Sequence, residues 1–499
     1  MPPKHSVPPR GLTSTRQSPS FEGKFGRMFR ALRPAFHPND ARVLAWLTEL
    51  GGAMTSDFDG PKDGRDDEES GIPALYTYFG QFIDHDLTFD PASSLQKAND
   101  PDALVDFRTP AFDLDNVYGR GPDDQPYMYQ ADGMRFELGA ALSGAGDAHA
   151  ADLVRGPNGR ALIGDPRNDE NSLVSQLQGL FQRFHNRFVT QNTDLSFQDV
   201  QREVRFHYQF VVLNDFLPRI VHSSVLDELR TEGLFDSGNL RFYKPKHSPF
   251  LPVEFSVAAY RLGHSMIRPG YRVNDGVLLP IFPAPAHGLN EGLTGFRPMD
   301  PNRGMDWGRF IDVDVRAYDG DAAAQQKRLQ FAYRIDTALV NILGELPAEV
   351  AKNPSSLPAR NLIRAWRLGL PSGQDVARAM KLTPLKDADI RIGQGLESGL
   401  PTKTIADVAG GAFKGRCPLW TYILAEAMLH MEAVKLPVVE DVTIQTPRLG
   451  PVGGRIVAEV FLGLMFGDPH SMLNQQPDWC PREGPGYGLR DFVRYALGD

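Results

Sequence analysis

The sequence predicts a mainly α-helical protein with long loops and little β structure, folded as one large domain. Apolar residues recur at helical spacing in several segments, whereas the two-residue alternation typical of strands is scarce. Neither an internal repeat nor a linker divides residues 41–499. A chain of 499 residues is long enough for two or three domains, but large helical enzymes also form single units.

Apolar periodicity places the helices, and prolines and glycines mark their ends. We expect a first helix over residues 41–50 that stops at Gly51 and Gly52, and Pro73 in the first turn of the next helix. Residues 91–170 show little periodicity and are expected to form long ordered loops. The later helical segments are 173–188, a helix beginning near Ser196 and capped with Asp199, 255–267, 331–346, 361–366, 375–380, 420–432 and 454–465.

Residues 1–40 form a basic arm, in which seven lysines and arginines precede residue 39 against the single acid Glu22. The bias is also typical of an organelle transit peptide, but prolines interrupt any amphipathic helix there. We therefore favour a flexible or surface-wrapping arm.

The overall composition excludes several classes of protein. A net charge of −9 argues against a nucleic-acid partner, which needs a concentrated basic face. No apolar run approaches the roughly 18 residues of a membrane span, so the chain is expected to be soluble. Two cysteines cannot make a disulfide framework, which favours the cytoplasm, with non-classical secretion as the alternative.

The segment Phe79-Gly-Gln-Phe-Ile-Asp-His-Asp86 sets polar residues into an apolar run. On a helix, Gln81 and His85 share one face as an i, i+4 pair with Asp84 beside them, while Asp86 points elsewhere. Polar groups aimed into apolar surroundings need a partner, so this face predicts a cofactor, a metal or a substrate. The alternative is a structural, salt-bridged histidine.

A second segment, Thr109-Pro-Ala-Phe-Asp-Leu-Asp115, places Thr109, Ala111, Asp113 and Asp115 at alternate positions. In an extended loop these oxygens face the same way, and calcium is the hard cation they suit, with Asp86 as a further ligand. An acidic turn that caps its own backbone is the alternative.

Two more segments carry candidate residues. Arg167 and Glu170 lie just before the 173–188 helix, where a salt bridge or a cap is the alternative to a role at the Gln81 and His85 face. His264 follows Gly263, whose small size lets a flat ligand approach, although a lone histidine on an apolar helix is often part of the core.

Seven motifs occur in an order that resembles the animal-type haem peroxidases, the peroxidase–cyclooxygenase superfamily, over residues 72 to about 480, and in particular its short bacterial members. Besides the two segments quoted above, they include Gly-Asp-Pro-Arg-Asn-Asp-Glu at 164–170, Phe-His-Asn-Arg at 184–187 and Tyr-Arg-Leu-Gly-His at 260–264. The others are Arg-Asn-Leu-Ile-Arg at 360–364 and Leu-Gly-Pro-Val-Gly-Gly-Arg at 449–455.

The resemblance implies a peroxidase that reduces hydrogen peroxide through an oxyferryl intermediate on haem b. His85 matches the distal histidine that moves the peroxide proton, as general acid-base catalysis requires. Arg167 matches the distal arginine that stabilises developing charge, and Gln81 matches the amide that positions water or halide.

The resemblance also implies how the cofactor and calcium are held. His264 matches the axial iron ligand and Asn361 its hydrogen-bond partner, with Arg364 of the same motif beside the haem. Asp84 and Glu170 match the carboxylates that form ester bonds to haem. The calcium set is Asp86, Thr109, Ala111, Asp113 and Asp115.

The chain departs from the family pattern at Asn171, where myeloperoxidase has the methionine of a third haem link. We therefore expect bromide, iodide, thiocyanate or phenols, rather than chloride, as the small-molecule donors. One alternative is a fatty-acid dioxygenase, whose radical tyrosine would stand at the position of Arg261, with Tyr260 one residue further away. The other is a non-catalytic haem- or calcium-binding protein.

Overall fold

The computed structural model describes residues 25–56, 65–88, 110–245, 249–283, 291–320, 322–351, 353–393, 401 and 403–498. Helices predominate in these ranges, which confirms the predicted fold class. The longer helices are α1 (Arg42–Ala53), α2 (Leu75–Leu87), α4 (Ser172–Gln191), α5 (Phe197–Val211), α10 (Leu357–Arg367), α11 (Gly373–Ala379), α12 (Leu419–Ala427), α13 (Pro451–Gly467) and α15 (Leu489–Leu497).

The strands of the described residues form small two-stranded sheets. The pairs are β1 (Phe25–Gly26) with β6 (Leu251–Pro252), β2 (Thr55–Ser56) with β10 (Leu339–Val340), β3 (Glu69–Pro73) with β9 (Phe331–Tyr333), β4 (Arg230–Thr231) with β5 (Leu234–Phe235), β7 (Gly270–Asn274) with β8 (Val277–Pro280), and β11 (Met431–Lys435) with β12 (Thr443–Pro447). The β1–β6 and β2–β10 pairs are parallel and the others antiparallel. The β1–β6, β2–β10 and β3–β9 pairs connect distant parts of the chain, whereas the other three are local hairpins.

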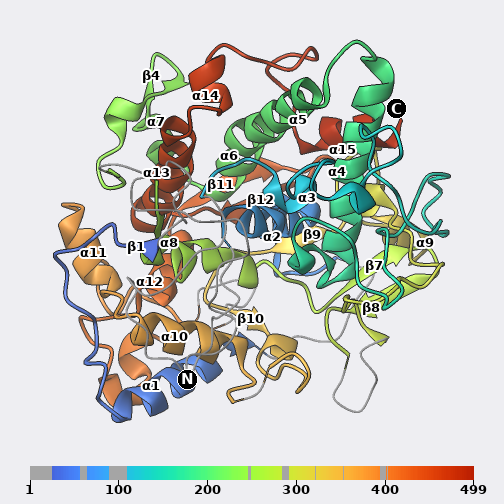
Figure 1. Cartoon of the computed structure of the whole chain (residues 1–499). Helices are drawn as coiled ribbons and strands as arrows, with labels where there is room; N and C mark the ends of the chain where they lie inside the picture. The colour runs from blue at the N-terminus through green and yellow to red at the C-terminus, as the bar shows by residue number, and fades with distance from the viewer. Residues whose placement is uncertain are drawn as a thin grey trace, which may run out of the picture.

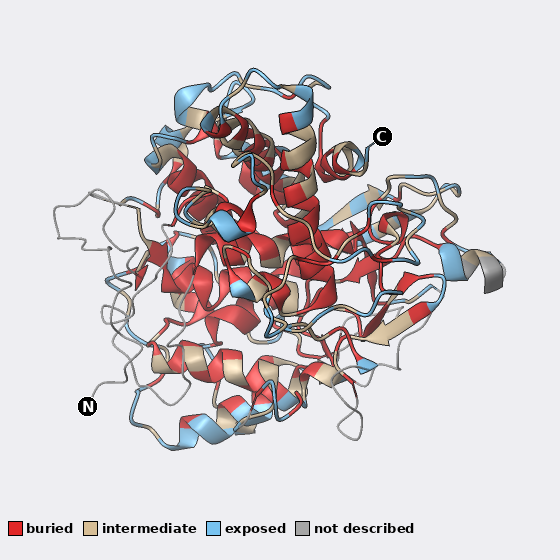
Figure 2. Cartoon of the chain, turned by 45° about the vertical axis from the view of Figure 1, so that its right-hand side comes forward, coloured by how far each residue is buried: buried red, intermediate tan, exposed pale blue. Residues whose placement is uncertain are grey.

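Helix α2 lies at the centre of the molecule, as Figure 1 shows, and buried residues fill the helices around it (Figure 2). Phe82 of α2 stacks on Phe181 of α4 with ring centroids 4.4 Å apart. Phe79 meets Phe216 edge-on at 5.5 Å, and Phe216 belongs to a π-helical turn, Val212–Phe216, that follows α5. Aromatic packing of this kind fixes the position of α2 within the core.

Only one face of α2 is less than fully buried. Gly80, Gln81 and Asp84 are half-buried, whereas every other residue of the helix is buried. Asp84 lies one helical turn after the adjacent Gly80 and Gln81, so the three form a single stripe. The stripe is the face on which the sequence places the functional residues.

Several predicted helices are confirmed. Helices α4, α10 and α13 include the segments 173–188, 361–366 and 454–465, and α11 covers the predicted 375–380 segment as far as Ala379. Ser196 caps α5, because its hydroxyl accepts a hydrogen bond from the backbone N–H of Asp199 at 3.2 Å.

Two predicted helix boundaries are wrong. Helix α1 continues through Gly51 and Gly52 to Ala53, because Gly51 fits against the backbone of Ala359 on α10, where a Cβ atom would come within 2.8 Å. Pro73 ends strand β3 instead of starting a helix, since β3 pairs with β9. Close helix packing and strand pairing overrode the local signals.

The helix predicted over 255–267 is broken in two. α8 spans Val253–Ser256 and a 3₁₀ helix, η6, spans Ala259–His264. Arg261 explains the break, because its Nε donates to the backbone oxygen of Ser256 at 2.9 Å and occupies the carbonyl that would continue the α-helical ladder. His264 therefore lies at the end of a short, tightly wound turn.

The helix predicted over 331–346 is absent. These residues form β9, β10 and a 3₁₀ turn at Asn341–Leu343. Residues of this segment are buried because they pair with β3 and β2, and a short apolar run does not distinguish a buried strand from a helix. The helix predicted over 420–432 likewise ends at Ala427, and β11 begins at Met431.

Part of the N-terminal basic arm packs against the body. Its strand β1 pairs with β6, and the N–H groups of Met28 and Phe29 donate to the buried carboxylate of Glu254 at 3.1 Å. Residues 25–40 thus follow the surface of the helical body.

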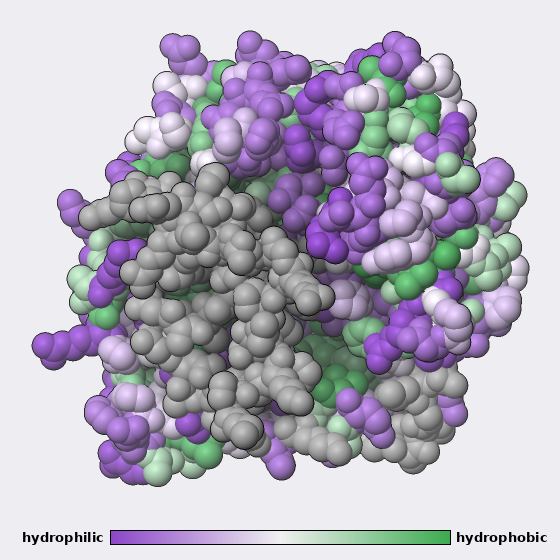
Figure 3. All heavy atoms as spheres, viewed as in Figure 1, coloured by the Kyte–Doolittle hydropathy of each residue, from purple (hydrophilic) through white to green (hydrophobic). Residues whose placement is uncertain are grey.

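Among the residues that the structure describes, no helix is both long enough and apolar enough to cross a bilayer. On the face in Figure 3 hydrophilic residues predominate and hydrophobic ones lie in small groups among them.

Candidate haem site

Three predicted residues meet beside the half-buried stripe of α2. The Gln81 amide nitrogen donates to Glu170 Oε1 in a short hydrogen bond, and His85 Nε2 lies 3.5 Å from the same oxygen. Glu170 directly follows the 3₁₀ turn η3 (Pro166–Asp169) and precedes α4. The predicted i, i+4 pair therefore shares one pocket with Glu170, while Asp84 stands half-buried on the same stripe.

A second set of hydrogen bonds fixes the His85 ring from behind. Asn168 Oδ1 lies 2.8 Å from His85 Nδ1, and Asn168 Nδ2 donates to Gln178 Oε1 at 2.7 Å. Since the amide nitrogen of Asn168 is directed at Gln178, its oxygen is the group available to His85, and Nδ1 carries the proton. In the neutral ring Nε2 is then the nitrogen that accepts a proton on the Glu170 side.

Arg167 lies at the edge of this pocket, at the carboxyl end of α2. Its guanidinium pairs with Asp165 at 2.7 Å and donates to the backbone oxygens of His85, at 3.0 Å, and Thr88. Burial disfavours its charge, but Asp165, assisted by Asp84 and Glu170, raises its pKa overall. Arg167 thus contacts the backbone of His85, and its predicted role at the Gln81 and His85 face stays a prediction.

The predicted axial residue His264 is also held by an amide. Asn361 Nδ2 on α10 lies 2.7 Å from His264 Nδ1, and Arg364 follows one turn later, half-buried. Burial, with a contribution from Arg261, lowers the pKa of His264 to about 3, so the ring is neutral at ordinary pH. Because the oxygen and nitrogen of an amide are nearly isosteric, Asn361 can also present Oδ1 to a protonated Nδ1, which leaves Nε2 free to bind a metal.

Tyr260 joins the two halves of the site. Its hydroxyl, one turn before His264, donates to the backbone oxygen of Gly80 on the α2 stripe at 3.2 Å. Burial raises the pKa of Tyr260, and the neighbouring Asp84 carboxylate adds to the effect. The elements that bear His85 and His264 are therefore in contact, although about 180 residues separate them in sequence.

The space next to His264 is suited to a flat ligand. A Cβ atom at Gly263 would meet no heavy atom within 4 Å, although buried residues surround the turn. Open space beside a neutral, amide-held imidazole, on an element that contacts the α2 stripe through Tyr260, fits a haem that His264 would ligate.

The predicted calcium ligands are only partly described. Thr109 lies outside the described residues. Asp86 Oδ2 accepts a hydrogen bond from the N–H of Leu114 at 3.3 Å. Asp113 Oδ1 accepts one from the N–H of Asp115 at 3.1 Å, and this second bond forms the self-capping turn named above as the alternative. Across the described ranges, no group of three or more His, Cys, Asp or Glu side chains is arranged to hold a metal ion.

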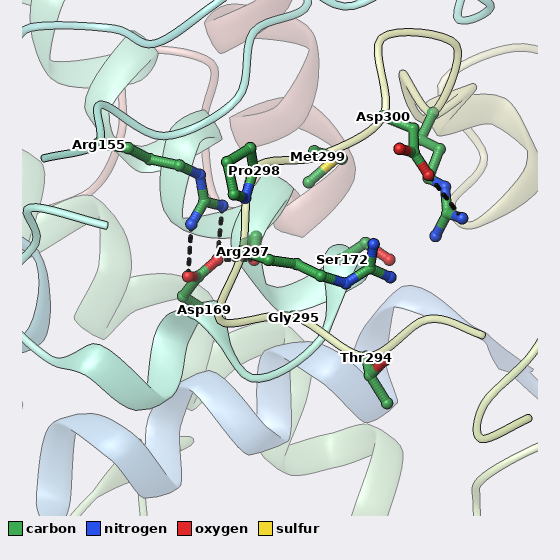
Figure 4. Close-up of a pocket in the computed structure, with 11 residues that line it drawn as sticks. Arg155, Asp169, Ser172, Thr294, Gly295, Arg297, Pro298, Met299 and Asp300 are labelled. Atoms are coloured by element: carbon green, nitrogen blue, oxygen red, sulfur yellow. Dashed lines mark hydrogen bonds and ion pairs between the residues drawn. The ribbon is translucent and has the colours of Figure 1, made fainter. Parts of the chain in front are cut away.

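A surface recess (Figure 4) is lined by Arg155, Arg297 and Arg303, together with Asp169, the residue before Glu170. Three carboxylates match these charges, because Arg155 pairs with Asp152 and Asp169, and Arg303 pairs with Asp300, at 2.7–2.8 Å. The Gly295 N–H in its wall donates to the backbone oxygen of Glu170 at 2.9 Å. This balanced network supports the Glu170 backbone.

Sequence reasoning missed Asn168 and Gln178, which orient His85, and the contact that Tyr260 makes. A signal existed for Gln178, since it is polar and fully buried on a helix with an apolar stripe. Asn168 carries no such local signal, because only the fold brings it to His85.

Comparison with known proteins agrees with this geometry. Residues 96–281 match the family model described as animal haem peroxidase, a region that includes Arg167, Glu170 and His264. A peroxidase-like protein of Margaritifera margaritifera is 24% identical over 307 residues, which is 50% of this chain and 36% of that protein. The chain thus spans about a third of that relative's length.

Solved structures show the same fold over nearly the whole chain. Peroxidase A from Dictyostelium discoideum aligns with a TM-score of 0.61 at 14% identity, covering 96% of this chain and 95% of that one. The fatty acid alpha-dioxygenase of Oryza sativa aligns at 0.54 and 13%, covering 96% and 79%.

The chain thus has the fold of these two solved structures. Residues 96–281 are similar to the animal haem peroxidase family, and the resemblance predicted from the motifs is confirmed.

Proposed function

We propose that the chain is a haem-dependent peroxidase that reduces hydrogen peroxide and oxidises a small anionic or aromatic donor. The observation that supports this most is the His85 ring, held by Asn168 at Nδ1 and facing Glu170 and Gln81 with Nε2. A fixed imidazole with one bare nitrogen is the group that general acid-base catalysis of peroxide cleavage requires.

The chain's own residues would hold the cofactor from both sides. His264 would ligate the iron through Nε2 with Asn361 on its other nitrogen, Arg364 would lie beside the ring, and Asp84 and Glu170 would form the ester bonds. Haem, when bound, supplies the iron at which peroxide is reduced. Mass spectrometry of the denatured holoprotein tests the esters, because ester-linked haem stays with the chain.

Proton movement follows from the hydrogen bonds. His85 Nε2 accepts the proton of peroxide and returns it to the departing oxygen. The Gln81 amide, fixed against Glu170, positions water or halide. Arg167 holds the His85 backbone at the carboxyl end of α2, and its charge favours negative charge developing nearby.

Iodide, bromide, thiocyanate or a phenol are the donors that we propose, with chloride the poorest. A steady-state comparison of these donors with purified holoprotein tests this. We expect His85→Ala to lower kcat/KM for peroxide at least about a hundredfold, as is typical for loss of a general acid-base group. An unchanged value would exclude that role, and a parent protein that turns over no donor would favour the non-catalytic haem- or calcium-binding alternative.

Fatty-acid oxygenation is the second candidate. The observation in its favour is that Tyr260 of η6 contacts the α2 stripe, close to Asp84. Its hydroxyl is engaged with the Gly80 carbonyl, however, and Arg261 occupies the position three residues before His264. Rapid oxygen uptake with linoleate or arachidonate would favour the dioxygenase.

Calcium is proposed at Asp86 and the 109–115 loop. Asp86 and Asp113 approach the same buried phenol, since burial and then these two carboxylates raise the pKa of Tyr208. A cation there would offset the two charges, with the Thr109 side chain, the Ala111 carbonyl and Asp115 as further ligands. We expect chelator treatment to lower the thermal midpoint and added calcium, but not magnesium, to restore it. An unchanged midpoint would contradict the site.

A further inference from the structure

Asn171 performs two tasks with one amide. Its Oδ1 accepts from the backbone N–H groups of Leu173, at 3.1 Å, and Val174, at 2.9 Å, and so caps the 20-residue helix α4. Because backbone N–H groups can only donate, this end of the amide must be the oxygen. The nitrogen, Nδ2, is thereby directed away from the helix.

The orientation of the Asn171 amide determines the orientation of the Gln81 amide. Asn171 Nδ2 donates to Gln81 Oε1 at 3.1 Å, so the nitrogen of the Gln81 amide faces the other way. That nitrogen donates to Glu170 Oε1, the oxygen 3.5 Å from His85 Nε2. An isolated amide can turn over at little expense, but here the helix end determines its orientation.

We propose that Asn171 is a positioning residue of the distal pocket: as the cap of α4, it sets which end of the Gln81 amide faces Glu170 and His85. The hydrogen bonds alone support the positioning role of Asn171, whereas the effect of Asn171 on donor binding rests on the proposed function. Asn171 thus gives this chain a use for the position at which the sequence departs from the methionine pattern.

The competing explanation is that Asn171 is a helix cap and nothing more. Asn171→Ser separates the two, because serine caps helices as well as asparagine but has no amide nitrogen to reach Gln81. Asn171→Asp also keeps the cap and offers Gln81 an acceptor, which would turn its amide around.

The first readout needs no haem. In nitrogen-15 spectra of the haem-free protein, the side-chain amide signal of Gln81 is assigned by its loss in Gln81→Leu. We expect this signal to move in Asn171→Ser and Asn171→Asp while the thermal midpoint of Asn171→Ser stays within about 2 °C of the parent. An unmoved signal in both variants would overturn the proposal.

The second readout uses the holoprotein with iodide and peroxide. We expect Asn171→Ser to raise KM for iodide on the order of fivefold with a smaller change in kcat, and to add nothing in a Gln81→Leu background. If the double variant raised KM for iodide by the product of the two single effects, Asn171 would act independently of Gln81. If the parent oxidises no iodide, the proposed function fails, while the amide signal still decides the positioning role.

Discussion

At the scale of single residues, the pocket depends on amides that orient imidazoles. Asn168 holds His85, and Asn361 holds His264. Such partners around catalytic or ligating histidines typically contribute tenfold to a hundredfold to activity or affinity. The positions of both histidines are useful only while these amides keep the rings in one tautomer.

We expect Asn168→Ala to slow peroxide consumption by about tenfold to a hundredfold, because His85 Nδ1 loses its acceptor and the ring can turn. Steady-state rates at saturating donor measure the effect. Asn168→Asp is the matched control, since it keeps an oxygen for Nδ1–H and should retain most of the rate. Equal rates in the parent and the alanine variant would show that Asn168 does not fix the ring.

Several of these side-chain arrangements could be predicted from the sequence. Gln81 and His85 share a face as their spacing requires, Glu170 joins them, and Asn361 partners His264. The orientation of Arg167 could not be predicted, because its partner Asp165 and the backbone of α2 compete for the guanidinium. Hydrogen-bond competition of this kind depends on distances that only the fold sets.

At the scale of elements, the amino end of α13 is capped from another helix. The buried carboxylate of Glu426 on α12 accepts from the N–H groups of Val452, at 2.9 Å, and Gly453, at 3.1 Å. Burial raises the pKa of Glu426 to about 7, although these two N–H groups oppose the shift. The folded state therefore holds a proton here that the unfolded chain, with a carboxyl pKa of 4.5, gives up.

It follows that the Glu426 contribution to stability is fully present below about pH 4.5 and is lost as the pH rises through about 7. The difference between a carboxyl pKa of about 7 in the folded state and 4.5 in the unfolded chain corresponds to about 3 kcal/mol of unfolding free energy. We expect Glu426→Gln, which keeps an acceptor oxygen, to flatten this part of the curve of unfolding free energy against pH. Glu483→Gln, at an exposed position, is the control and should leave the curve unchanged. Parallel curves for parent and Glu426→Gln would contradict the assignment.

The elements themselves were predictable where their periodicity was long. The 173–188 stripe and the 454–465 run are helices α4 and α13. The helix predicted over 331–346 is wrong because the burial of this segment comes from strand partners elsewhere in the chain. The continuous helix predicted over 255–267 is wrong because the Arg261 side chain donates to a backbone carbonyl that a helix would use. Tertiary partners, not local propensity, decided both.

At the scale of the whole molecule, a buried ion network joins distant segments. Glu69 on β3 pairs with Arg268 and Arg328, each at 2.6 Å, and its other oxygen accepts from Tyr318 at 3.3 Å. All four side chains are buried. A buried carboxylate between two guanidinium groups is maintained only while all partners are present.

We expect Glu69→Ala to destabilise the protein by about 3–5 kcal/mol, because two buried arginines lose their counterion. Urea denaturation measures the change. Glu69→Gln keeps the hydrogen-bond acceptor without the charge and should fall between the parent and the alanine variant. A shift below about 1 kcal/mol for Glu69→Ala would show that water replaces the carboxylate.

The contact between Tyr260 and Gly80 closes a loop of about 180 residues. Closing such a loop costs on the order of 5 kcal/mol of chain entropy, so Gly80 and Tyr260 come together only when most of the chain has condensed. During synthesis the segment around Gly80 leaves the ribosome long before Tyr260 exists. On the proposed function, the haem site would therefore be completed late in folding, and a chain interrupted before residue 260 would lack His264, the proposed iron ligand.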